Sequence, residues 1–125
     1  MREIIFRGKS TDEEEWIEGW IEGLLCYNIY DGLCIQPATE GFCCVVSKET
    51  IGQFTGSYDV NCNKIFEHDI VKKVVNGKEF IGVVEYADAA FGVRFADGEG
   101  QFLCFFENCC EIIGNIHDNP ELTKM

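Results

Sequence analysis

The stretch KIFEHDIVKKVVNGKEFIGVV, residues 64–84, decides the fold that this sequence predicts. Asn76-Gly77 lies between two apolar runs, and this dipeptide is the strongest short signal for a β-hairpin. Short apolar runs separated by Gly, Asp and Asn continue on both sides, which is the pattern of a mainly β chain. We therefore expect two antiparallel strands joined by a tight turn.

Further strands are predicted downstream of this hairpin. Residues 80–95 predict two strands around a turn near Asp88, and Asp97-Gly98 is a second hairpin signal. The later apolar runs are residues 102–106 and 111–116. A small twisted sheet of this kind tends to curl, which removes its exposed edges. The expected fold is mainly β: a small SH3-like barrel or a curled antiparallel meander, with an additional N-terminal β segment.

The N-terminal part of the chain is harder to assign. Residues 2–8, 41–47 and 50–56 predict strands, and 57–64 predicts a turn rich in Asn and Asp. Residues 11–25 fit two structures, because Trp and Ile recur at helical spacing and also alternate as in a strand. Two glycines in this segment would weaken a helix by about 1 kcal/mol each.

The 125 residues are expected to form a single domain with three sub-parts. These are an N-terminal β segment (1–49), a barrel-like core (50–118) and a tail (119–125), in which Pro120 can open a short helical turn.

The charge of the chain restricts its partners. Ten basic residues against 22 acidic ones give a net charge of −12, which repels phosphate backbones and anionic membranes. Lys72, Lys73 and Lys78 form a local basic spot, which we interpret as a solvated strand edge. No apolar run reaches the length of about 20 residues that spans a bilayer. The start of the chain has no signal-peptide core, so we expect a cytoplasmic protein.

Eight cysteines are expected to remain thiols in that compartment. No Cys-x-x-Cys occurs, and the vicinal pairs Cys43-Cys44 and Cys109-Cys110 are poor chelators in a strand. Most are interpreted as small buried hydrophobes. A zinc site assembled from distant cysteines is the weaker alternative.

The cluster Glu67-His68-Asp69 contains the residue types of an acid/base or metal site. In an extended segment Glu67 and Asp69 share a face and His68 points away, so the three do not converge on one atom. The favoured interpretation is a turn in which Asp69 accepts backbone N–H hydrogen bonds and His68 is exposed. The other His–acid neighbour is His117-Asp118. No motif of a nucleotide-binding or hydrolytic enzyme occurs, so we predict no enzyme activity, no cofactor and no metal.

The aromatic residues of the second half could form a stacking platform for single-stranded nucleic acid. That mode needs a basic groove, so core packing is the favoured role for the residues concerned. They are Phe91, Phe95, Phe102, Phe105 and Phe106.

Four stretches resemble the YopX family of phage and prophage proteins. They are MREIIFRGK at the start, IGQFTG at 51–56, KIFEHDIV at 64–71 and IIGNIHDNPEL at 112–122. In that family the middle block usually has Gly where this chain has His68, and also where it has Cys62. The resemblance therefore implies that these two positions serve backbone geometry. It also implies a strand over residues 16–25 and transfers no catalytic residue.

We predict a structural role, and no chemical one, for a set of residues in these motifs and in the neighbouring turns and strands. They are Gly52, Gln53, Thr55, Gly56, Glu67, Asp69, Gly82, Gly114, Asn115, Asn119 and Pro120.

Two functions follow as hypotheses. The first is a non-enzymatic phage or prophage accessory protein that binds a protein partner, for example of the host, and forms a homo-oligomer. The alternative is a small barrel that binds nucleic acid. Its support is the Asp-Ile-Val strand entry followed by Gly82-Val83-Val84.

Overall fold

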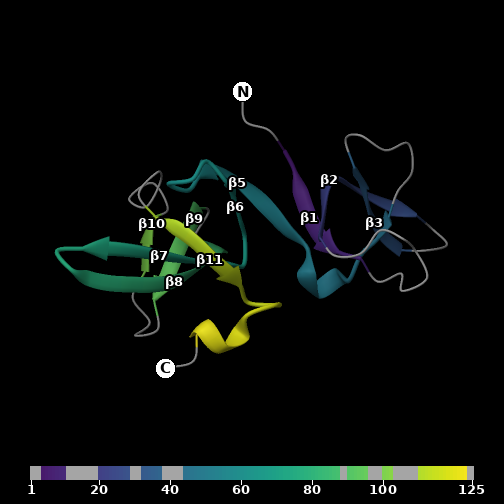
Figure 1. Cartoon of the computed structure of the whole chain (residues 1–125). Helices are drawn as coiled ribbons and strands as arrows, with labels where there is room; N and C mark the ends of the chain where they lie inside the picture. Colours follow the sequence, from purple (N-terminus) through teal and green to yellow (C-terminus); the bar gives the residue numbers. More distant parts are fainter. Residues whose placement is uncertain are drawn as a thin grey trace. The chain divides into compact units, whose positions relative to one another are not determined.

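The computed structural model describes residues 4–10, 20–28, 32–37, 44–87, 90–95, 100–102 and 110–123. These residues form two antiparallel sheets and short 3₁₀ turns, with no α-helix among them (Figure 1). The mainly β fold predicted from the sequence is confirmed. Over the same residues, no helix has the length and apolar character that crossing a membrane requires. The chain divides into two compact units, Met1–Phe54 and Thr55–Met125, and each is described by itself.

The first sheet has the strand order β4-β3-β2-β1-β5-β6; β1 to β4 and residues 52–54 of β5 lie in the first unit, whereas residues 55–58 of β5 and all of β6 lie in the second. Its strands are β1 (Phe6–Lys9), β2 (Trp20–Asn28), β3 (Gly32–Pro37), β4 (Cys44–Val45), β5 (Gly52–Tyr58) and β6 (Lys64–Phe66), and a 3₁₀ turn η1 (Lys48–Thr50) precedes β5. The strand predicted over 16–25 is confirmed from Trp20 onward, whereas 11–19 lie outside the described residues. The strand predicted over 41–47 is described only from Cys44, and β4 has two residues.

Alternation along these strands produces a small core in the first unit. Ile21, Ile35, Cys44 and Val46 are buried there, with Phe6, Leu25 and Ile51 packed against them. The register explains Gly23, which lies opposite Pro37. A Cβ at this position would run into the backbone carbonyl of Gln36, so the close approach of β2 and β3 requires glycine.

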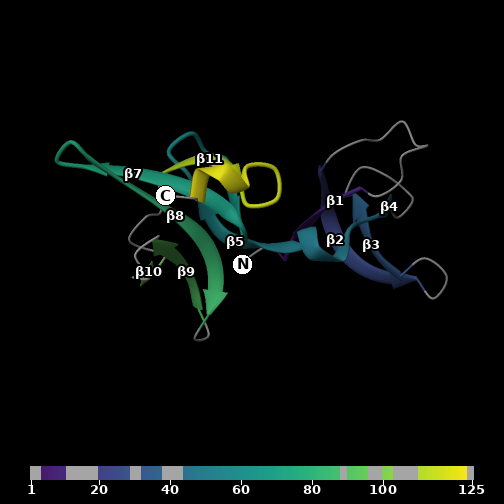
Figure 2. The same ribbon diagram turned by 90° about the horizontal axis from the view of Figure 1, so that it is seen from below.

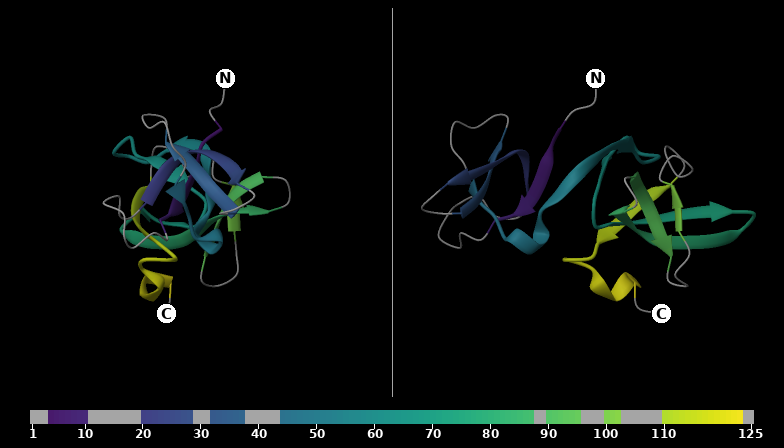
Figure 3. Two further views of the ribbon diagram at one scale, coloured as in Figure 1. Left: turned by 90° about the vertical axis from the view of Figure 1, so that its right-hand side faces the viewer. Right: turned by 180° about the vertical axis from the view of Figure 1, so that it is seen from behind.

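The second unit contains a sheet with the order β10-β9-β8-β7-β11. Its strands are β7 (Asp69–Val75), β8 (Lys78–Ala87), β9 (Ala90–Phe95), β10 (Gly100–Phe102) and β11 (Glu111–Asn115), followed by the 3₁₀ turn η3 (Pro120–Thr123). Figure 2 shows how strongly β8 curves along its length, and Figure 3 shows η3 following β11. The 3₁₀ turn that Pro120 was expected to open is confirmed.

The second unit has its own core cluster. It consists of Ile65, Val71, Val84, Val93 and Cys110, with Phe91, Phe95 and Ile112 packed against them. Two of the five platform aromatics, Phe91 and Phe95, thus take the predicted core role. Phe105 and Phe106 lie outside the described residues, and for Phe102 only the backbone is described.

The hairpin predicted at Asn76-Gly77 is confirmed. Asn76 has φ 53° and Gly77 has φ 80°, the two positive values that a type I′ turn requires. The two strands predicted on either side of Asp88 are confirmed, because β8 and β9 pair as far as Ala87 and Ala90; Asp88 itself lies outside the described residues. The second hairpin signal, Asp97-Gly98, lies outside the described residues.

The simple meander expected from residue 65 onward needs correction. Strands β7 to β10 do follow one another as antiparallel neighbours, but β6 belongs to the other sheet and β11 returns to pair with β7. Over the residues that are described, no barrel closes, and β10 and β11 are the two edges of the sheet. Apolar patterning predicts that a strand exists, whereas this long-range pairing has no local signal.

Candidate functional site: the paired-histidine junction

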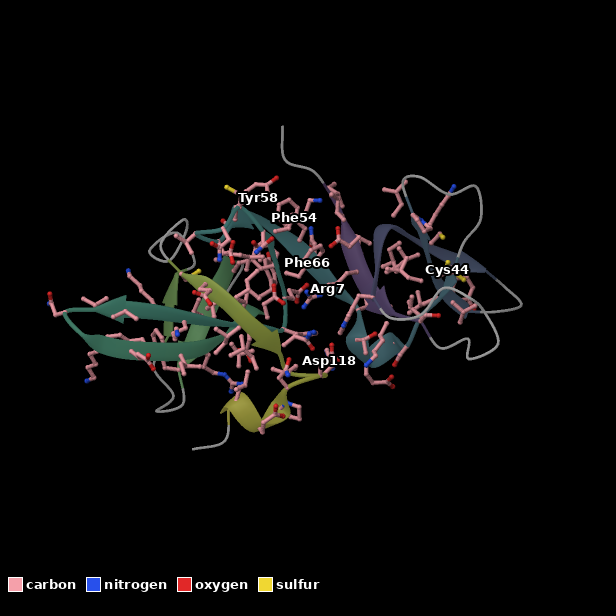
Figure 4. All side chains as sticks on the ribbon, viewed as in Figure 1. Arg7, Cys44, Phe54, Tyr58, Phe66 and Asp118 are labelled. Atoms are coloured by element: carbon pink, nitrogen blue, oxygen red, sulfur yellow. The ribbon has the colours of Figure 1, made fainter. Side chains whose placement is uncertain are left out.

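Two turns that are far apart in the sequence meet at one end of β7. The first turn joins β6 to β7 and includes Glu67 and His68; the second follows β11. Asn115 lies opposite Asp69 in the strand register, and the N–H of Ile116 donates to the carbonyl of His68 at 3.0 Å. Figure 4 labels Phe66 in the first turn and Asp118 in the second. We call this meeting point the paired-histidine junction.

Asp69 organises the first turn. Its side chain is buried, and Oδ2 accepts a hydrogen bond from the N–H of Phe66 at 2.8 Å. The N–H of His68 donates to the carbonyl of Val84 at 2.8 Å, which ties the turn to β8. The predicted backbone-capping role of Asp69 is confirmed, because its carboxylate closes the turn over the two residues between.

Asn115 organises the second turn. Its Oδ1 accepts from the N–H groups of His117 at 3.0 Å and Asp118 at 2.9 Å, and its Nδ2 donates to Asp118 Oδ2 at 3.3 Å. The N–H of Asn119 donates to the carbonyl of Asn115 at 2.8 Å. These local bonds explain why a chain leaving a strand turns here. They also bring Asn119 against Gly114, where a Cβ would approach the Asn119 side chain too closely.

The two histidines of the chain lie together at the junction. His117 Nε2 and His68 Nδ1 are 3.2 Å apart, and the rings meet edge to face with centroids 5.1 Å apart. One imidazole must donate and the other accept, so at least one of the two nitrogens is unprotonated in this arrangement. The expectation that His68 is simply exposed was wrong, because its side chain is half-buried against His117.

The backbone at residue 68 fits the glycine position inferred from the resemblance. His68 has φ 75°, in the left-handed region, and Cys62 has φ 64°. Side chains with a Cβ are disfavoured there by about 1–2 kcal/mol. Both residues therefore occupy positions in which backbone conformation is the main requirement.

Replacing His68 by glycine is expected to change the free energy of unfolding by less than about 1 kcal/mol. Relief of the left-handed strain offsets the lost contact with His117 and the added freedom of the unfolded chain. His68→Val should lose about 2 kcal/mol, because a β-branched residue fits this φ poorly. Urea unfolding of the three proteins checks this, and a valine variant as stable as the glycine variant would contradict it.

The described residues offer no metal site at the junction or elsewhere. No group of three or more His, Cys, Asp or Glu side chains among them could hold an ion. The described cysteines are spread over both units: Cys26, Cys34, Cys44, Cys62 and Cys110. Of these, Cys62 is exposed and Cys34, Cys44 and Cys110 are buried, as expected of small hydrophobes.

The side chain of Asp59 holds its loop in place through several backbone hydrogen bonds. The sequence predicted this residue only as part of a polar turn. It is buried, and Oδ1 accepts from the N–H groups of Asn61 at 2.9 Å and Asn63 at 2.8 Å. Its Oδ2 accepts from the N–H of Ile112 at 3.2 Å, while the N–H of Val60 donates to the carbonyl of Cys110 at 2.8 Å. Burial raises the pKa of Asp59, but the hydrogen bonds from Asn63, Ile112 and Asn61 outweigh it and lower the pKa overall.

The remaining predicted positions are four residues of β5, Gly82 of β8 and Pro120, the first residue of η3. Thr55 is buried, and its hydroxyl donates to the carbonyl of Ile65 at 2.8 Å. Gly56 has φ 90°, which favours glycine. Gly52 and Gln53 pair with Arg7 and Phe6 of β1. The structure thus gathers Glu67, Asp69, Gly114, Asn115 and Asn119 at the junction and leaves the β5 residues in their strand.

Comparisons with known proteins give one family and one fold. A family model described as "YopX protein" matches residues 5–124. The chain is similar to a solved structure described as "Crystal structure of protein EF1440 from Enterococcus faecalis", with a TM-score of 0.58 and 24% identity. The similarity covers 99% of this chain and 100% of that one, and it bears on the fold alone. No curated protein matches the chain.

Proposed function

Since the chain belongs to the phage-associated YopX protein family, we propose that it is a non-enzymatic accessory protein that binds protein partners in the host cytoplasm. The junction supports a structural use of its polar groups. Asp69, Asn115 and Asp59 each accept hydrogen bonds from backbone N–H groups, so their oxygens hold turns in place. Side chains committed in this way are poorly suited to act on a substrate.

The observation that carries the proposal is the exposed apolar surface on hairpins. Among the described residues, large apolar side chains are exposed at Ile4, Leu24, Tyr27, Tyr58, Val60, Val74, Val75 and Tyr86. Leu24 and Tyr27 belong to β2, whereas Val74 and Val75 come directly before the Asn76-Gly77 turn. A single exposed apolar residue is ordinary, but two of them on each of the strands β2 and β7 favour contact with another protein.

We expect the immobilised full-length chain to retain a defined protein from a host lysate. The double variants Leu24→Ser/Tyr27→Ser and Val74→Ser/Val75→Ser each remove one exposed apolar pair. One of them should reduce retention by at least about tenfold, because apolar groups near an interface centre carry most of the affinity. Mass spectrometry of the eluate with isotope-labelled standards measures the loss.

Val60→Ser is the matched control, because Val60 is also an exposed valine but contributes to the fold through its backbone N–H. It should leave retention unchanged. Recovery of no specific protein, or retention that neither double variant alters, would overturn the proposal.

Nucleic-acid binding is the second candidate function, and the lysines of the β7–β8 hairpin favour it. A curled sheet approaching an SH3-like barrel would present such a hairpin to a phosphate backbone. The test is titration of a fluorescent oligonucleotide at several salt concentrations. Micromolar binding that weakens steeply with salt would support this function over the first.

A further inference from the structure

The outer part of the β7–β8 hairpin, residues 72–81, forms an arm. Residues 74–79 are all exposed, so neither face of the ribbon is covered at its tip. Val74 and Val75 are neighbours and therefore project from opposite faces, with 56% and 39% of their surfaces exposed. Figure 1 shows this hairpin with its turn at the end away from β11. Both apolar side chains are available to a partner.

The charge of the arm is opposite to that of the rest of the chain. It carries Lys72, Lys73 and Lys78 and one acid, Glu79, for a net charge of +2. Because the whole chain has −12, the residues outside the arm carry −14. An arm of this sign is attracted to an acidic protein surface, whereas the −14 carried by the rest of the chain repels the phosphate backbone of a nucleic acid.

Contacts within the arm hold its side chains in place. Lys72 Nζ lies 3.9 Å from Glu79 Oε1 across the strands, and Lys78 Nζ lies 5.3 Å from the centre of the Phe80 ring. That ring meets Phe95 of β9 edge to face, with centroids 6.0 Å apart. A surface ordered before binding loses less conformational entropy when it docks.

An acidic surface lies in the same unit. The segment from Cys110 to Thr123, which forms β11 and η3, contains no Lys or Arg. Its charged side chains Glu111, Asp118 and Glu121 are all exposed. η3 contacts β8, the strand that continues into the arm. One unit thus carries both a basic, apolar arm and an acidic segment.

We infer that the arm of one copy docks on the acidic β11–η3 segment of a second copy, and that the second arm docks reciprocally. A surface with complementary halves pairs with itself under a two-fold rotation, which closes the assembly as a dimer. The inference rests on the proposed interaction function and adds a second copy of the chain as a partner. The valines supply the apolar contact, and Lys73 and Lys78 supply charge complementarity to Glu111 and Glu121 of the other copy. Lys72 lies opposite Glu111 within one copy, so its charge is not counted for the contact between copies.

The test is a charge swap between two full-length variants. Lys73→Glu/Lys78→Glu makes the arm acidic, and Glu111→Lys/Glu121→Lys makes the docking segment basic. Each variant alone should dimerise at least about tenfold more weakly than the wild type, because attraction becomes repulsion at both contacts. An equimolar mixture should form a heterodimer, since the acidic arm then faces the basic segment and the basic arm faces the acidic one.

Sedimentation velocity in a reducing buffer measures the dimer, because the exposed Cys62 could otherwise form disulfides between copies. Dimerisation should weaken as ionic strength rises from about 0.01 M to about 0.15 M, where the Debye length falls from about 30 Å to about 8 Å. Lys9→Glu/Lys48→Glu makes the same change in net charge at two exposed residues outside the arm and should leave the dimer intact. Far-UV circular dichroism confirms that each variant is folded.

Three results would overturn the inference. They are a monomeric wild type at low salt, an arm variant that still dimerises, and a mixture that forms no heterodimer. Salt-sensitive binding of the wild type to a fluorescent DNA duplex, lost in the arm variant, would assign the arm to nucleic acid instead. If the protein is monomeric but still retains a host protein from lysate, the inferred dimer is wrong. The proposed function is then unaffected.

Discussion

Asp59→Ala is expected to lower the free energy of unfolding by at least about 3 kcal/mol, because three backbone N–H groups lose a charged acceptor. The donors are those of Asn61, Asn63 and Ile112. Two of these bonds close the loop that leads into β6, and the third joins that loop to β11. Chemical denaturation at neutral pH measures the loss, and a change below about 1 kcal/mol would show that water replaces the carboxylate.

Asp59→Asn removes the charge of the side chain while keeping its shape, so it measures the contribution of the charge. The amide oxygen can still accept from Asn61 and Asn63, but the amide nitrogen would face the N–H of Ile112, donor against donor. The pKa of Asp59 is lowered in the folded protein, so its contribution is complete at neutral pH and is lost as pH falls through that pKa. The stability gap between wild type and Asp59→Asn should therefore narrow below about pH 4. A gap that is constant with pH would contradict this account.

Gly82→Ala is expected to lower the free energy of unfolding by about 2–3 kcal/mol through overpacking. Gly82 is buried opposite Val71 and Phe95 on the core face of β8. An added Cβ would overlap the Val93 side chain and lie 2.9 Å from the carbonyl oxygen of Arg94. The side chain can move, but the strand backbone cannot move without disturbing the β8–β9 pairing.

A second substitution tests this mechanism. Val93→Ala alone should destabilise by creating a cavity, because Val93 is buried in the core. Combined with Gly82→Ala, it opens space for the new methyl group, so the double variant should lose less stability than the two single losses added together. Strict additivity would mean that the Arg94 backbone contact, and not Val93, limits the site. Thermal unfolding of the wild type, the two single variants and the double variant measures the four stabilities of this double-mutant cycle.

Local chemistry made much of the second unit predictable. Asn76-Gly77 specified its turn because few residue pairs accept two positive φ angles, and short apolar runs rich in valine specified the strands on either side. The role of Asp69 was also predictable, because it depends on a backbone N–H three residues away. In each case the interaction and its sequence signal lie within a few residues of one another.

The features that were missed depend on distant parts of the chain. His68 and His117 are 49 residues apart, and their contact follows from the return of β11 to β7. No local pattern encodes that return, so His68 was expected to be exposed. Asp59 had a partial signal, since an Asp followed by Asn61 and Asn63 is typical of a side-chain-capped turn. The hydrogen bond between Asp59 and Ile112 had no signal in the local sequence.

The bond between Asp59 and Ile112 also has a consequence for how the protein is made. Asp59 and Ile112 are 53 residues apart in the sequence. The second edge of β7 is likewise paired only after β11 has been synthesised. On the ribosome, where the chain grows at about 5–20 residues per second, the loop carrying Asp59 emerges seconds before the strand that completes it. We expect the growing chain to hold the β7–β8 ribbon with one side open during that interval, and the unit to assemble only after β11 has emerged from the ribosome.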